Sequence, residues 1–162
     1  MITAHLPSGY VTGRLFGASR ACFWAAFLGA ILPDFDLIWF YFVDNRALHH
    51  HNYWVHIPAF WLLMASLVLP ATRWLKPSWI RPAMAFFAGI LVHLLLDTIA
   101  GDVKWLWPLS DRFFHLFTVP ATYENWILNF VLHPVFLLEI LIWVVALGLW
   151  WRNRVTRDSA QA

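Results

Sequence analysis

The chain has 162 residues, of which 61% are hydrophobic and only 12% are charged, and its formal net charge is +2. Soluble globular chains carry about 25% charged residues, and a fold of this size has too little interior for 12 Trp, 14 Phe and 4 Tyr. The composition excludes a nucleic-acid-binding domain, a disordered chain and, with Cys22 as the single cysteine, a disulfide-stabilised secreted domain, and it indicates an integral membrane protein.

Apolar stretches of about 20 residues predict membrane helices. Four such stretches predict the main transmembrane helices at 21–43, 57–75, 82–101 and 126–151. The stretch Leu6–Ser19 is weaker and contains glycine, so it predicts a short N-terminal re-entrant or interfacial helix. The expected fold is an all-α integral membrane helical bundle, with one membrane domain at 1–152 and a short polar cytoplasmic tail at 153–162.

The basic residues predict the orientation of these helices. Eight of the 11 Lys and Arg residues fall on one side of the predicted membrane, in the turns near 14–20 and 73–81 and after 151. The positive-inside rule places that side in the cytoplasm. We therefore expect a bacterial inner-membrane protein whose loops at 44–56 and 102–125 face the periplasm.

Four acidic residues lie within the predicted helices, whose interiors contain no Lys or Arg: Asp34, Asp36, Asp97 and Glu139. An ionised carboxylate in hydrocarbon is costly, and such residues usually face a cavity, pair with a cation or mark a functional site. Protonation would remove the charge of these acids, and a bound metal ion would compensate it.

Histidines accompany these acids. His93 and Asp97 are four residues apart, so they share one face of a helix; a core histidine bonded to its carboxylate is the simpler interpretation of that pair. The His49–His51 run followed by His56 would also suit a solvated loop, and Pro33–Asp36 would suit a helix-breaking turn. The predicted topology, however, brings all three segments to the periplasmic ends of their helices, at one depth.

Imidazole and carboxylate groups together suit Zn²⁺, with Mn or Fe as alternatives, and the lack of further cysteines argues against a closed structural zinc site. A metal site that keeps a water ligand lowers the pKa of that water to about 7 and supplies a hydroxide nucleophile. The pattern therefore predicts a divalent-metal site that activates water.

At these residues the chain resembles the YdjM-like inner-membrane proteins of bacteria, a family of predicted membrane-bound metal-dependent hydrolases. The resemblance runs from about His5 to Asp111. It rests on four motifs in order: Thr3-Ala4-His5, Gly29-Ala-Ile-Leu-Pro33-Asp34-Phe-Asp36, His51-Asn-Tyr-Trp-Val-His56, and His93-Leu-Leu-Leu-Asp97 leading to Trp107-Pro108. Asn52, Val55 and Ile57 depart from the Arg, Thr and Ser of many members.

The pattern and the resemblance together imply a set of site residues. The expected metal ligands are His5, Asp34, Asp36, His51, His56, His93 and Asp97, and the expected catalytic residues are Asp36 and Asp97. One Asp of the 34/36 pair, or Asp97, would accept a proton if it is not itself a ligand. His50 could replace His51, because three histidines are consecutive. His133, near the outer end of the last predicted helix, and Glu139, nearer its middle, are possible additional members, although Glu139 would equally suit a hydrogen bond to a neighbouring helix.

The sequence therefore predicts a membrane-embedded metal-dependent hydrolase that acts on an ester or phosphoester of an amphiphilic substrate. A looser similarity to zinc-dependent phospholipase C and P1-type nucleases suggests phosphoester cleavage. Two alternatives remain open at this point: a divalent-metal or proton transporter or channel component, and a non-catalytic structural or regulatory membrane protein. The expected partners are the lipid bilayer and a small-molecule substrate, without nucleic acid, and the sequence predicts no oligomeric state.

Overall fold

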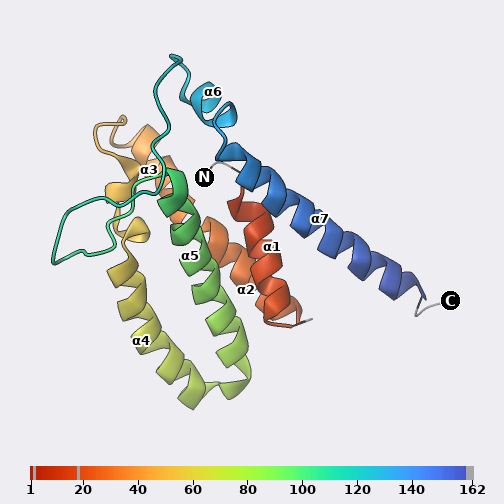
Figure 1. The fold of residues 1–162 in the computed structure, drawn as a ribbon. Helices are drawn as coiled ribbons and strands as arrows, with labels where there is room; N and C mark the ends of the chain where they lie inside the picture. The colour runs from red at the N-terminus through yellow and green to blue at the C-terminus, as the bar shows by residue number, and fades with distance from the viewer. Residues whose placement is uncertain (2, 18, 160–162) are drawn as a thin grey trace.

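The structure is a computed structural model that describes residues 1–159 except residues 2 and 18. It forms α-helices joined by short 3₁₀ turns (Figure 1). In chain order these are α1 (His5–Leu15), α2 (Arg20–Ile31), η1 (Pro33–Phe35), α3 (Asp36–Phe42), η2 (His50–Asn52), η3 (Trp54–His56), α4 (Pro58–Leu75), η4 (Pro77–Trp79), α5 (Ile80–Ala100), α6 (Trp126–Val131) and α7 (Phe136–Ser159). The described residues contain seven α-helices and no strand, only an isolated bridge between Val103 and Phe114. The all-α prediction is confirmed.

Three segments are long and apolar enough to cross a membrane: Pro58–Leu75, Pro77–Ala100 and Phe136–Arg154. The predicted helix at 21–43 is broken instead, because α2 meets the η1–α3 segment at an angle of 47°. Pro33 explains the break, since proline has no N–H to donate and its ring clashes with the preceding turn. If the bent pair counts as one span, the described residues contain four candidate spans, the number predicted, and otherwise they contain three.

The predicted helix at 126–151 is also interrupted. α6 ends at Val131 and α7 begins at Phe136, with Pro134 in the turn between them. His133 therefore lies in a turn before α7, and only Glu139 lies on the helix where both were expected. α7 continues to Ser159, so the boundary predicted at residue 152 falls inside it, and residues 160–162 of the predicted tail lie outside the described residues.

The core of the bundle is the packing of α2 against α5, with α1 covering both. Gly29 and Gly89 permit the close approach of α2 and α5. A Cβ atom at Gly29 would overlap the backbone oxygen of Phe86, and one at Gly89 would overlap the backbone oxygen of Ala26. Small residues at helix contacts are typical of membrane bundles, where close backbone packing replaces the hydrophobic driving force. This contact fixes the height at which α2 ends beside α5.

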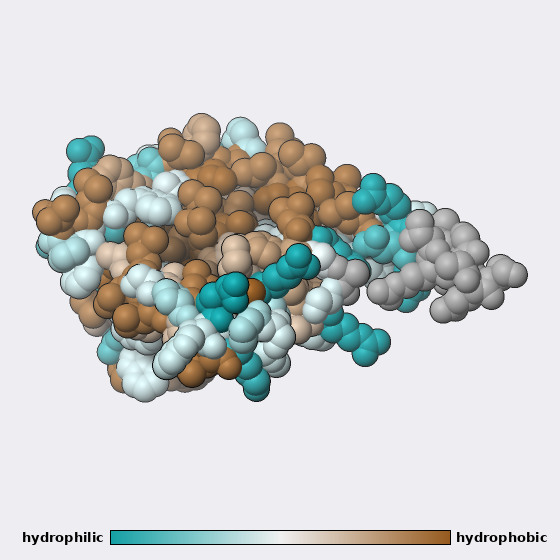
Figure 2. Space-filling model, turned by 90° about the horizontal axis from the view of Figure 1, so that it is seen from below, coloured by the Kyte–Doolittle hydropathy of each residue, from teal (hydrophilic) through white to brown (hydrophobic). Residues whose placement is uncertain are grey.

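α4 and α7 lie at the periphery and expose apolar side chains along their lengths, such as Leu62, Leu67, Leu137 and Val144. Seen from the end with the α4–α5 turn, much of the surface is hydrophobic around a smaller patch of hydrophilic residues (Figure 2). The α1–α2 turn lies at the same end of the molecule (Figure 1). We call this the basic end, because its turns contain Arg14, Arg20, Arg73, Lys76 and Arg81. The opposite end, where α2 stops at Ile31 and α5 stops at Ala100, we call the site end.

Candidate metal centre

At the site end, short elements surround the last two turns of α5 and deliver all of the predicted ligands to one cluster. The elements and their residues are α1 (His5), η1 (Asp34), α3 (Asp36), η2 (His51), η3 (His56) and α5 (His93 and Asp97). Breaks in the helices make this possible. Because the chain turns at Pro33, Asp34 and Asp36 lie beside α5 and α2 does not continue past it. α1 packs antiparallel to α2, so His5, the first residue of α1, lies at the site end.

Asp97 lies at the centre of the cluster and is buried. Its Oδ2 atom lies 2.9 Å from Nε2 of His93, 3.6 Å from Nε2 of His56 and 3.7 Å from Nε2 of His51. Its Oδ1 atom lies 3.1 Å from Nε2 of His5. One carboxylate therefore faces four imidazole nitrogens that come from four different elements.

Asp34 approaches the same nitrogens from the other side. Its Oδ1 lies 3.8 Å from Nε2 of His93 and 4.0 Å from Nε2 of His56, and its Oδ2 lies 4.0 Å from Nε2 of His5. The side chain of Asp34 is 33% exposed, whereas these histidines are buried. Asp34 is thus the carboxylate of the cluster that is accessible from the surface of the protein.

Backbone carbonyls fix the orientation of two of the rings. His93 Nδ1 donates to the carbonyl oxygen of Ala30 at 2.8 Å, at the end of α2. His51 Nδ1 lies 2.7 Å from the carbonyl oxygen of Asp102 and 3.2 Å from its backbone nitrogen, and the shorter contact requires Nδ1 to donate. Because the Nδ1 atom carries the proton in each ring, the Nε2 atom presents its lone pair to the cluster. Metal-binding histidines are typically held in this way.

His56 is oriented by a carboxylate. Its Nδ1 lies 2.8 Å from Oδ2 of Asp36, within ion-pair distance but off the line of a hydrogen bond. Its Nε2 lies 3.3 Å from Nε2 of His93. Asp36 therefore lies behind His56, on the far side of the ring from Asp97 and His93.

Several buried polar atoms of the cluster have no hydrogen-bond partner among the described residues. Among the described residues, the buried side-chain atoms without a hydrogen-bond partner lie on His5, Asp36, His50, His56 and Asp97, which belong to the cluster, and on Arg14, which does not. The amino group of Met1 donates to Asp97 Oδ1 at 2.8 Å, but Oδ2 stays unpartnered. Buried acceptors that face one another are unfavourable unless a cation lies between them. The residues therefore fit a divalent metal ion.

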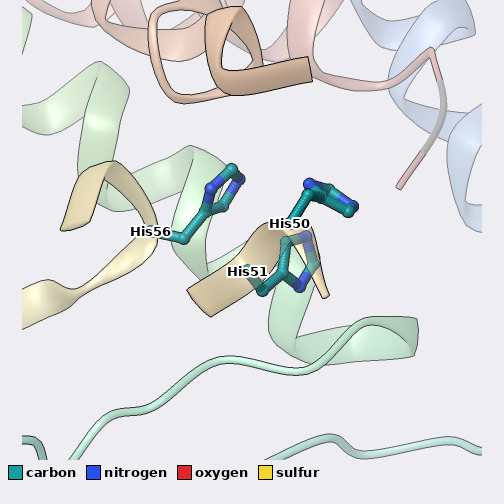
Figure 3. Close-up of side chains that lie close together, drawn as sticks. All are labelled: His50, His51 and His56. Atoms are coloured by element: carbon teal, nitrogen blue, oxygen red, sulfur yellow. The ribbon is translucent and has the colours of Figure 1, made fainter. Parts of the chain in front are cut away.

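Three groups of described residues share members, and within each group the ligand atoms lie within 4.8 Å of one another. The groups are His5, His93 and Asp97; Asp34, His56 and His93; and His50, His51 and His56. The rings of the third group come from two successive turns of the chain (Figure 3). His51 is buried and faces Asp97, whereas His50 is partly exposed and its Nδ1 lies 3.8 Å from Oδ1 of Asp36. The structure thus brings both histidines to the cluster, with His51 nearer its centre.

His51 is held tightly between its neighbours. A Cβ atom at Gly101 would lie 2.8 Å from Cε1 of His51 and 2.9 Å from the carbonyl oxygen of Asp97, so a glycine here lets the ring pack on the end of α5. Burial lowers the pKa of His51 to about 2. Burial and the neighbouring His50 also lower the pKa of His49. His51 is therefore neutral at ordinary pH, as a metal ligand must be.

Two of the possible additional residues do not join the cluster. His133 accepts a hydrogen bond from the backbone N–H of Val135 at its Nδ1, 3.3 Å away, which is a local turn contact. Glu139 is buried on α7 and accepts hydrogen bonds from Thr3. Neither belongs to the groups of described residues whose ligand atoms lie close together.

Sequence reasoning missed three residues that contact the cluster: Ala30 and Asp102, which act through their backbone carbonyls, and Met1, which acts through its amino group. Asp102 also accepts, through Oδ1, a hydrogen bond from His115 Nδ1 at 2.7 Å. Its position directly after the glycine that ends α5 is the one sequence signal that could have identified it. A contact through the carbonyl of an alanine leaves no such signal.

The family model described as YdjM inner membrane protein matches residues 1–156. The match extends beyond the segment from His5 to Asp111 on which the sequence resemblance rests. No curated protein and no solved structure matches the chain.

Proposed function

Because the chain belongs to the YdjM family of inner membrane proteins, and buries a His/Asp cluster at one end of its apolar helices, we propose that it is a membrane-embedded metal-dependent hydrolase. The observation that carries this proposal is a set of buried polar atoms around Asp97 that have no hydrogen-bond partner among the described residues, beside two imidazoles, those of His51 and His93, whose Nδ1 atoms donate to backbone carbonyls. Such a set is poorly suited to holding helices together, since a structural role would be better served by matched donors and acceptors. It suits a metal ion.

His5, His51, His56, His93 and Asp97 are the residues that would hold the ion. Zn²⁺ fits a set rich in imidazole better than Mn does, and Fe is the alternative. When bound, the ion would supply hydroxide from water near neutral pH and would stabilise the negative charge that develops on the substrate oxygen. We assign the role of proton acceptor to Asp34, because it is the carboxylate of the cluster that entering water can reach.

Asp36 and Asp97, the two residues expected to be catalytic, take different roles in this proposal. Asp36 is buried behind His56 and orients its ring. Asp97 faces four imidazole nitrogens and is engaged as a ligand. Each carboxylate thus keeps an essential place in the site without contacting the substrate.

The surroundings of Asp34 support an amphiphilic substrate. The next residue, Phe35, and the α3 residues Ile38 and Trp39 are all more than half exposed. In a membrane this apolar surface would contact lipid, within five residues of the partly exposed carboxylate. A substrate with its ester or phosphoester group at the cluster and its apolar part in the bilayer fits this arrangement.

The distribution of charge supports a site on the periplasmic side. The basic end carries the residues that the positive-inside rule places in the cytoplasm, and the cluster lies at the other end of the same helices.

The test is hydrolysis by the purified protein in detergent, assayed on lipid phosphoesters, aryl phosphoesters and carboxyl esters. The expected result is turnover of at least one class, lost on chelation and restored by Zn²⁺. His93→Ala should remove the activity, whereas Glu124→Gln, a change at an exposed loop carboxylate, should not. Activity that resists chelation, or Zn²⁺ flux into proteoliposomes without any turnover, would contradict the proposal.

A further inference from the structure

A second buried carboxylate lies outside the metal centre, on α7. Glu139 is 0% exposed, and its helix is one of the three segments that are long and apolar enough to span a membrane. A carboxylate in that setting is costly unless its oxygens are hydrogen-bonded. Because Glu139 belongs to none of the groups of described residues that could share an ion, its place in the helix needs another explanation.

Glu139 binds the segment that precedes α1. The backbone N–H of Thr3 donates to both carboxylate oxygens, at 3.0 Å and 3.2 Å, and the hydroxyl of Thr3 donates to Oε2 at 2.7 Å. One turn along α7, the indole N–H of Trp143 donates to the same hydroxyl at 3.1 Å. Glu139 and Trp143 are four residues apart and share a helix face, so two side chains of α7 bind Thr3.

Thr3 lies two residues before His5, the first residue of α1. Unlike His51 and His93, His5 has no hydrogen bond at either ring nitrogen to any residue that the structure describes. Its ring stacks on His93, with the ring centroids 3.8 Å apart, and its Nε2 lies 3.1 Å from Oδ1 of Asp97. The position of this imidazole therefore depends on that stacking and on where the backbone before α1 is fixed.

We propose that Glu139 is a positioning residue: by holding Thr3, it places His5 against Asp97 as a ligand of the metal centre. This inference rests on the proposed function, because it gives His5 a metal to bind. It also explains the packing of α7, whose main contacts within the described bundle are with α1. α7 acts as the support of the one ligand that comes from the N-terminal segment.

The experiment measures Zn²⁺ affinity of the full chain in detergent by competition with a chromophoric chelator. Glu139→Ala should weaken Zn²⁺ binding on the order of 10–100-fold, the usual effect of losing a group that orients a metal ligand. Glu139→Gln, whose amide oxygen can still accept from Thr3, should retain affinity within about fivefold. Thr3→Val, which removes only the hydroxyl, should give an intermediate loss.

A double-mutant cycle with His5→Ala separates positioning from general loss of structure. If Glu139 acts through His5, Glu139→Ala should cause no further loss of Zn²⁺ affinity in the His5→Ala protein. Leu137→Ala, at an exposed position on the same helix, is the control and should bind Zn²⁺ like the wild type. If Glu139→Ala does not yield folded protein, Thr3→Val in the same cycle decides the question.

Equal losses with and without His5, or wild-type affinity in Glu139→Ala, would overturn the inference and leave the proposed function standing. A wild-type protein that binds no Zn²⁺ would overturn the proposed function and this inference with it.

Discussion

The Nε2 atoms of His56 and His93 lie 3.3 Å apart, at the meeting point of η3 and α5. The Nδ1–H group of His93 donates to the carbonyl oxygen of Ala30, so the Nε2 atom of His93 presents a lone pair to the ring of His56. The Asp36 carboxylate 2.8 Å from Nδ1 of His56 favours the proton at that atom and a lone pair at its Nε2 as well. Two lone pairs at this distance repel each other unless a proton or a metal ion lies between them. The carboxylate oxygens of Asp34 and Asp97, within 4.0 Å of both nitrogens, make a divalent cation the better match.

The first prediction concerns metal content. His56→Ala and His93→Ala should each lower Zn²⁺ affinity by more than about 100-fold, since the loss of a direct ligand exceeds the effect of an orienting group. Metal analysis of purified protein checks this. His133→Ala removes a histidine outside the cluster and should keep the wild-type metal content; a loss there as large as in His93→Ala would contradict the assignment.

The second prediction concerns Asp36, which orients His56 without facing the centre. Asp36→Asn should weaken Zn²⁺ binding by about 10–100-fold while the protein stays folded. Competition with a chelator measures the change. Asp111→Asn, at a side chain that is 84% exposed, is the matched control. A loss in the control, or an unchanged affinity in Asp36→Asn, would show that Asp36 has no such role.

The third prediction concerns Gly101. A methyl group there would contact the ring of His51 and the end of α5, so Gly101→Ala should displace His51 and lower Zn²⁺ affinity by roughly tenfold or more. Gly148→Ala is the matched control, because a Cβ atom at that position meets no atom within 4 Å. Only the methyl group at position 101 would contact neighbouring atoms. Equal Zn²⁺ affinities in the two variants would therefore refute the prediction.

The fourth prediction concerns pH. The pKa of His51 is lowered to about 2 in the folded protein and is about 6.5 in an unfolded chain. Between these values the unfolded state binds the extra proton, so His51 should make the metal-free protein less stable as pH falls below 6.5, by at most about 1.4 kcal/mol per pH unit. Thermal unfolding in detergent after chelation should therefore show a weaker pH dependence in His51→Gln than in the wild type. Parallel pH profiles would contradict this expectation.

The fifth prediction concerns topology. The basic end should lie in the cytoplasm and the metal centre should face the periplasm. Alkaline phosphatase fused after Ala162 should be inactive, and the same enzyme fused after Pro120, in the loop that follows α5, should be active. The reverse pattern would place the site in the cytoplasm.

The convergence of the His/Asp motifs was predictable because local spacing encodes much of it. His93 and Asp97 share a helix face by their separation alone, and Pro33 marks the turn that exposes Asp34 and Asp36. The length of the apolar stretches, which is also a local property of the sequence, predicted the candidate spans at α4, α5 and α7.

Contacts made through the backbone or between distant segments were not predictable. The carbonyls of Ala30 and Asp102 orient two imidazoles, yet their side chains give no sign of it. The pairing of Thr3 with Glu139 joins residues 136 positions apart, and no periodicity encodes such a contact. Hydrophobicity likewise missed the break at 132–135, where the chain stays apolar around Pro134.

The contact between Thr3 and Glu139 has a consequence for how the protein is made. The segment before α1 is synthesised before α7, because it precedes α7 in the chain. With the positioning role proposed for Glu139, His5 reaches its final position only after α7 has been synthesised. A chain that has not yet made α7 would then lack a complete ligand set.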